Sequence, residues 1–221
     1  PSLPASSPAK PAEAHLSNPA PTTTATPKTA EGVTPKAAET TSAKSLANTR
    51  LAAWQLGSGM SLAALAHDRG VAKDKVPAWF AQAQSAAKQL GVTVAELPTP
   101  APPADANPAS KQVMNYLLVD GQRIGRELTK QYGPATSALF EVAIKSNILL
   151  VLYAPGSTEG ASIADAVSDA APRAKLPGDL WKPLVDLLDR QLPASDVRLA
   201  VQKMHTDVGE YLKGAAGQGS R

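Results

Sequence analysis

Residues 133–153 read GPATSALFEVAIKSNILLVLY, the most apolar run in the chain. Turn residues bound the run, with Gly133-Pro134 at its start and Pro155-Gly156 just after its end. A helix drawn through it is apolar on most faces, which is typical of a helix in the interior of a fold. Full burial of each large apolar side chain contributes about 1.5–3 kcal/mol. We therefore predict one buried central helix over 134–153, with other helices packed around it.

The composition of the 221-residue chain favours helices over sheets. Hydrophobic residues make up 43% of the chain, with Ala prominent among them, and aromatic residues only 4%. Ala and Leu rank high in helix propensity, whereas strands favour β-branched and aromatic residues. Apolar residues recur at spacings of three and four between turn residues along the chain. We therefore predict an all-α fold, an irregular bundle of about seven helices.

Changes in composition divide the chain into five segments. Residues 1–44 are rich in Pro, Ala and Thr and poor in large apolar side chains, so we predict a disordered low-complexity tail. We expect a helical hairpin over 45–91, a Pro-rich linker over 92–107, a helical domain over 108–213 and a flexible C-terminus over 214–221. The sequence leaves open whether the hairpin packs on the helical domain or hinges away from it.

Two glycines, Gly57 and Gly59, lie in the middle of the first expected helix. Each Gly inside a helix costs about 1 kcal/mol relative to Ala, so the pair needs a structural reason. Close approach of a second helix is the simplest one. No strand precedes the glycines, so they do not indicate a phosphate-binding loop.

Charge, cysteine content and hydropathy narrow the classes of partner. The net charge is +3, from 22 basic and 19 acidic residues that are interspersed, so nucleic-acid binding is not favoured. The chain has no cysteine, which excludes disulfides and thiolate metal sites. The apolar run 148–152 is far shorter than the roughly 20 residues that a bilayer requires, so we expect no membrane span.

The start of the chain bears on processing and compartment. It lacks Met and a signal-like apolar segment, so we expect a processed or trimmed product. We expect a soluble protein, with export as one option. The compartment and the oligomeric state stay open.

A polar step, Lys145-Ser146-Asn147, interrupts the central helix. Glu141 precedes Lys145 by four residues, the favourable order for an ion pair on a helix surface. If Asn147 faces inward, its amide needs partners from backbone or from a loop such as Pro155-Gly156. The candidate polar cluster, functional or structural, comprises Glu141, Lys145, Ser146, Asn147 and His205.

The histidines and serines form no catalytic or metal-binding motif. His15, His67 and His205 lack the i, i+4 spacing of a metal-binding pair on one helix. No serine lies in a Gly-x-Ser-x-Gly nucleophile motif. A haem bound by His205 or Met204 is an alternative, but we expect Met204 in the core and His205 at its edge. We therefore assign no catalytic residue, cofactor or metal.

The sequence does not identify a function, and three hypotheses stay open. The leading one is a non-enzymatic helical interaction or scaffold module, tethered by the tail, that binds a protein or another partner through a groove between helices. One alternative is an enzyme or cofactor-carrying domain with a core site near Lys145, Asn147 and His205. Another is a nucleic-acid-associated protein that uses the Lys-containing tail.

Overall fold

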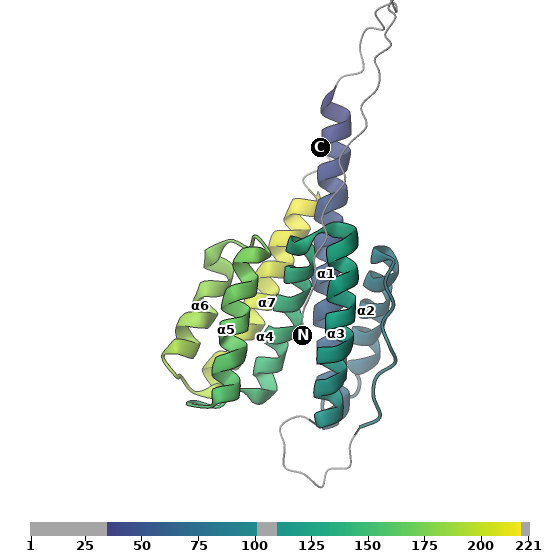
Figure 1. Cartoon of the computed structure of the whole chain (residues 1–221). Helices are drawn as coiled ribbons and strands as arrows, with labels where there is room; N and C mark the ends of the chain where they lie inside the picture. Colours follow the sequence, from purple (N-terminus) through teal and green to yellow (C-terminus); the bar gives the residue numbers. More distant parts are fainter. Residues whose placement is uncertain (1–34, 101–109, 218–221) are drawn as a thin grey trace, which may run out of the picture. The chain divides into compact units, whose positions relative to one another are not determined.

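A computed structural model describes residues 35–100 and 110–217, with side chains from residue 45 onward. This part of the chain forms seven α-helices and contains no strand, which confirms the predicted all-α bundle (Figure 1). The helices are α1 (Pro35–Arg69), α2 (Val76–Leu90), α3 (Lys111–Tyr132), α4 (Pro134–Leu152), α5 (Thr158–Arg173), α6 (Gly178–Asp189) and α7 (Ala194–Gly217).

Helix α4 is the predicted buried central helix, and α1 shares the centre with it. Eleven of the 19 residues of α4 are buried. In α1, every residue from Ala52 to Ala66 is buried except Gln55 and Leu62. Figure 1 shows the two helices in the middle of the bundle, with α2 and α3 on one side and α5, α6 and α7 on the other. The bundle is therefore organised around a pair of helices.

The hairpin formed by α1 and α2 packs into the bundle, which answers the question that the sequence left open. Helix α1 contacts α3, α4 and α7 as well as α2. One core cluster joins α1, α2, α3 and α4, and a second joins α4 to α5, α6, α7 and Trp54 of α1. The seven helices form one compact unit.

Gly57 and Gly59 bring α1 against two neighbouring helices, as predicted. A Cβ on Gly57 would lie 2.7 Å from the carbonyl oxygen of Phe140 on α4. A Cβ on Gly59 would lie 2.6 Å from the carbonyl oxygen of Trp79 on α2. Real Cβ atoms do not approach other atoms so closely, so both contacts require glycine.

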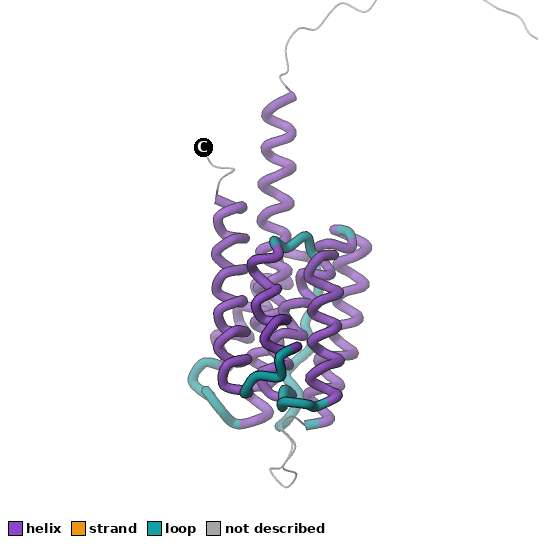
Figure 2. The backbone as a smooth tube through the Cα atoms, turned by 90° about the vertical axis from the view of Figure 1, so that its left-hand side faces the viewer, coloured by secondary structure: helices purple, strands orange, loops and turns teal. Residues whose placement is uncertain are grey.

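Helix α1 begins at Pro35, ten residues before the expected start at 45. Pro is tolerated in the first turn of a helix, and the Ala, Glu and Lys residues that follow favour helix. Figure 2 shows these first turns projecting past the ends of the other helices. Residues 1–34 of the predicted tail lie outside the described residues. At the other end, α7 continues to Gly217, so the first part of the expected flexible C-terminus is helical.

The start of α3 is tied to the end of α1 through one polar contact. The side chain of Ser110 caps α3 by accepting a hydrogen bond from the Val113 N–H at 3.1 Å. The Ser110 hydroxyl and backbone N–H both donate to the carboxylate of Asp68 on α1. This contact fixes where α3 begins beside the central pair.

Among the described residues, α4 alone is long and apolar enough to cross a bilayer, with a mean hydropathy of 1.5. The test is one of length and composition only, and 61% of the apolar window is buried inside the bundle. Interior packing accounts for the apolar character of α4.

Candidate functional site

The predicted polar cluster falls into two separate parts of the structure. Glu141 and Lys145 form an ion pair on a partly exposed strip of α4, and Glu141 also pairs with Arg173 of α5 at 3.1 Å. Ser146 and Asn147, which directly follow Lys145, are buried. The helical periodicity of α4 explains the division, because consecutive positions point about 100° apart around the axis.

His205 of α7 lies at the junction of three helices and contacts Ser146. The Nε2 atom of His205 is 2.7 Å from the Oγ of Ser146 on α4. The Nδ1 atom is 3.3 Å from the Oγ of Ser58 on α1. The ring also packs on Trp54 of α1, with ring centroids 4.7 Å apart. His205 therefore links α1, α4 and α7.

The hydrogen-bond partners of His205 suit a neutral imidazole. The Ser146 hydroxyl lies 2.7 Å from the carbonyl oxygen of Val142 and donates to it. It then accepts a hydrogen bond from Nε2–H, and the Ser58 hydroxyl donates to Nδ1. Burial lowers the pKa of His205 from 6.5 to about 4, because charging the ring would leave a cation in a desolvated site.

Asn147 joins α4 to α1 through a second hydrogen bond. Its side-chain nitrogen donates to the Oγ of Ser61 at 2.9 Å, and the Ser61 hydroxyl donates to the carbonyl oxygen of Gly57 at 2.6 Å. The partner is a side chain of the neighbouring helix and not the Pro155-Gly156 loop that the sequence suggested. The carbonyl that accepts the hydrogen bond from Ser61 belongs to Gly57, the glycine of α1 that packs against α4.

Ser58, Ser61, Ser146, Asn147 and His205 form a hydrogen-bonded cluster between α1, α4 and α7. This cluster has the chemistry of a structural cross-link. Ser146 is completely buried and its hydroxyl is bonded to backbone, so it is not presented as a nucleophile. A serine-histidine-acid triad orients its imidazole through a carboxylate, whereas Nδ1 of His205 contacts the Ser58 hydroxyl. No group of three metal-ligating side chains gathers anywhere in residues 45–100 or 110–217.

The tryptophans do not line a shared groove. Trp54 and Trp181 are buried and Trp79 is partly buried. The Nε1 of Trp181 has no hydrogen-bond partner among the described residues. Trp54 and Trp181 therefore belong to the hydrophobic core.

A groove of about 560 Å³ runs between α3 and α4. Its apolar floor is formed by Leu117, Phe140, Ile144 and Ile148, each at most 5% exposed, and Leu118 stands beside them with 51% of its surface exposed. Gly121 and Gly125 face α4 from α3: a Cβ at these positions would lie 3.4 Å from the Cδ1 of Ile144 and 3.3 Å from the Oγ of Ser137. The two glycines therefore let α3 pack closely against α4 along this groove.

Basic side chains dominate the rim of the α3/α4 groove. Arg126 and Lys130 lie four residues apart on α3, are exposed and have no ion pair within the described part of the chain. Lys145 lines the groove from α4, beside Glu141. Because Glu141 is already paired with Lys145 and Arg173, the groove presents a net positive rim.

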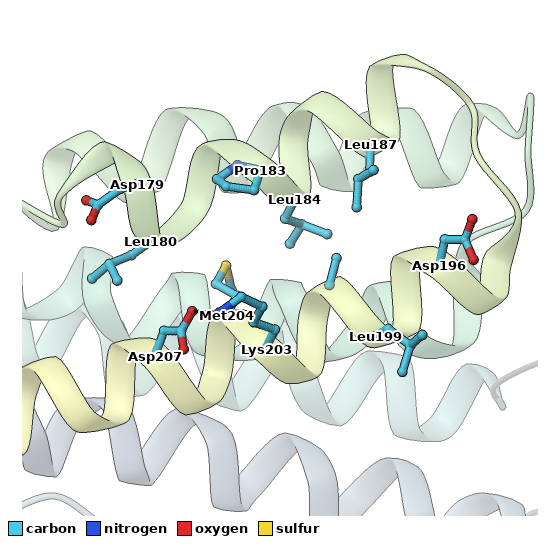
Figure 3. A pocket seen from close by; sticks show the side chains of 11 residues that line it. Asp179, Leu180, Pro183, Leu184, Leu187, Asp196, Leu199, Lys203, Met204 and Asp207 are labelled. Atoms are coloured by element: carbon cyan, nitrogen blue, oxygen red, sulfur yellow. Dashed lines mark hydrogen bonds and ion pairs between the residues drawn. The ribbon is translucent and has the colours of Figure 1, made fainter.

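A smaller groove of about 340 Å³ lies between α6 and α7. Figure 3 shows Leu180, Leu184 and Leu187 of α6 facing Met204 of α7 across it. Its charged lining comprises Asp179, Asp196 and Asp207, with Lys203 as the one cation, which pairs with Asp207 at 2.7 Å. The two grooves therefore carry opposite net charge.

Sequence reasoning missed the α3/α4 groove. Two local signals pointed to it: the Gly121 and Gly125 pair at i, i+4, and Leu118, an apolar residue beside the inner stripe of α3. The groove forms only where this face of α3 meets α4, so neither signal identified a surface without the tertiary contact.

Comparison with known proteins gives no matching family model, no matching curated protein and no matching solved structure. A proposed function for the chain therefore rests on the geometry of its described residues alone.

Proposed function

We propose that this chain is a protein-interaction module that binds a segment of a partner protein in the groove between α3 and α4. The observation that carries the proposal is the groove itself, with its apolar floor and the half-exposed Leu118. Its volume of about 560 Å³ lies in the range of roughly 300–1,000 Å³ typical of ligand sites. The Pro-, Ala- and Thr-rich N-terminal residues keep their proposed role as a tether.

An exposed apolar side chain of α3, Leu118, supports an interaction surface. Leu118 lines the groove and is 51% exposed, although α3 has a separate inner face that is buried in the core. Contiguous exposed apolar surface next to a groove marks sites of association more often than isolated apolar residues do.

The alternative of an enzyme or cofactor carrier has less support. His205, Ser146 and Asn147 form hydrogen bonds to one another or to neighbouring core groups, and Lys145 is paired with Glu141. Neither the α3/α4 groove nor the α6/α7 groove is lined by His205, Ser146 or Asn147. The alternative of a nucleic-acid-binding tail concerns residues outside the described part.

Selection from a displayed library of random 16-residue peptides tests the proposal. Enriched peptides are measured by fluorescence anisotropy against the wild-type chain, Leu118→Glu and Val119→Glu. Both substitutions place a carboxylate at an exposed apolar position of α3, but only Leu118 lines the groove. We expect Leu118→Glu to weaken binding at least tenfold and Val119→Glu to leave it within about twofold, since truncating an anchor side chain typically costs more than 1 kcal/mol.

Two results would remove the proposal. One is a selection that yields no binder whose affinity depends on Leu118. The other is equal weakening by Val119→Glu and Leu118→Glu. Circular dichroism and thermal melting of both variants establish that each one folds like the wild type.

A further inference from the structure

We propose that the partner segment is an amphipathic α-helix with an acidic edge, an inference that rests on the proposed function. The α3/α4 groove offers three matched features for such a helix: a linear apolar floor, a length of several helical turns and a basic rim.

The length and direction of the groove suit a short helix. Its α3 lining extends from Leu117 to Lys130, which corresponds to roughly 20 Å at about 1.5 Å rise per residue. A helix of the same length has about 13 residues. An extended peptide gains affinity by pairing with the edge of a sheet, and the described residues contain no strand that offers an edge.

The floor of the groove repeats with helical spacing. Phe140, Ile144 and Ile148 follow one another at i, i+4 and i+8 along α4. A partner helix lying beside them presents apolar residues at i, i+3 or i+4, and i+7, the arrangement by which amphipathic helices occupy grooves.

The positive charge of the rim favours a partner helix with carboxylates along the edges of its apolar face. Three cations, Arg126, Lys130 and Lys145, and one carboxylate, Glu141, line the groove, a net charge of +2. Arg126 and Lys130 have no ion pair in the described part of the chain, so they are available to carboxylates on a bound helix. In the α6/α7 groove, three Asp and one Lys give a net charge of −2, which disfavours the same segment there.

A pair of designed peptides tests the charge and the conformation. Both have 14 residues and the same Leu positions on one face of a helix; one carries Glu along both edges of that face and the other carries Lys. A third peptide is the Glu peptide with a central Pro, which breaks the helix. Binding is measured by anisotropy at about 50 and 250 mM salt, since Coulomb interactions between exposed charges are screened as salt rises.

We expect the Glu peptide to bind at least tenfold more tightly than the Lys and Pro peptides. Its affinity should decrease at the higher salt concentration. The double variant Arg126→Glu/Lys130→Glu lowers the affinity for the Glu peptide at least tenfold and raises it for the Lys peptide. Lys88→Glu, an exposed charge reversal on α2, and Leu199→Glu, on an exposed leucine of the α6/α7 groove, change the affinity by less than about twofold.

Equal binding of the Glu and Lys peptides, or no effect of the double reversal, would overturn the inference. Tight binding of the Pro peptide would do the same, because the bound segment would then not be helical. If no peptide binds, but the chain binds vesicles of anionic phospholipid and loses this binding when Leu118, Arg126 and Lys130 are substituted, the groove is a lipid-binding site. Concentration-dependent dimerisation lost in Leu118→Glu would assign it to a second copy of the chain.

The library selection separates this inference from the proposed function. Leu118-dependent binders that are neither acidic nor helical would support the proposed interaction module and contradict the inference that its partner is an acidic helix. The absence of any Leu118-dependent binder would remove both.

Discussion

Ser146 of α4 and His205 of α7 are 59 residues apart in the chain, yet the Oγ of Ser146 and the Nε2 of His205 are 2.7 Å apart. Ser58 of α1 contacts the other ring nitrogen at 3.3 Å. One imidazole therefore links three helices through the Ser58 and Ser146 hydroxyls and the Trp54 ring, so its protonation state affects the contacts of all three.

The stability of the fold should decrease as the pH falls from about 6.5 to 4. The folded-state pKa of His205 is about 4, below the unfolded value of 6.5, because burial disfavours the charged ring. The unfolded chain therefore binds this proton more readily, and the stabilisation by the neutral ring, present in full above pH 6.5, is lost as the pH falls through 4. The two pKa values correspond to a loss on the order of 3 kcal/mol in the free energy of unfolding.

Urea unfolding at several pH values, followed by tryptophan fluorescence, measures this loss. His205→Gln serves as the comparison, because carboxylates outside the cluster titrate alike in both proteins. The variant should be less stable than the wild type at pH 7.5 and should lose less stability on acidification. Parallel pH profiles for the two proteins would show that His205 contributes nothing to the dependence.

Gly57→Ala should destabilise the bundle by about 1–3 kcal/mol. Its Cβ would lie 2.7 Å from the carbonyl oxygen of Phe140 and 2.9 Å from the Cβ of Ala143, both on α4. Backbone on one side of the contact cannot yield without moving α1 away from α4.

Gly209→Ala on α7 is the matched control for Gly57→Ala. The nearest atom to its Cβ would be the Nε1 of Trp54 at 4.0 Å, so the methyl group fits. The substitution should stabilise the fold by about 0.5–1 kcal/mol through helix propensity. Thermal melting of both variants gives the signs, and a neutral Gly57→Ala would contradict the close approach.

Asn147 and Ser61 should show energetic coupling in a double-mutant cycle. Asn147→Ala and Ser61→Ala each remove one end of the 2.9 Å hydrogen bond between α4 and α1. We expect a coupling free energy of about 0.5–1.5 kcal/mol, the usual net contribution of such a bond. A cycle of Asn147→Ala with Ser137→Ala, whose hydroxyl instead donates to the Gly125 carbonyl, should be additive within about 0.5 kcal/mol. Equal coupling in both cycles would argue against a specific bond.

Local contacts were predictable from the sequence, and distant ones were not. The Glu141–Lys145 ion pair follows from spacing along one helix, and the structure has it. The low helix propensity of glycine predicted that a second helix lies close to Gly57, but not which helix it is. Ser61, the partner of Asn147, lies 86 residues away in the chain, and Ser146, the partner of His205, lies 59 residues away. Helical periodicity relates only residues within a few turns of one helix, so it does not predict these contacts.

The sequence by itself determined the helices and the burial of α4, because helix propensity and the distribution of apolar residues act over a few turns of chain. Tertiary packing decided that α1 shares the core with α4, that His205 and Ser146 meet, and that Leu118 borders a groove with a basic rim. These features depend on which faces of distant helices come together, a choice made by the sum of burial across the whole bundle. The surface that we propose for binding belongs to this second kind, since neither α3 nor α4 carries the groove alone.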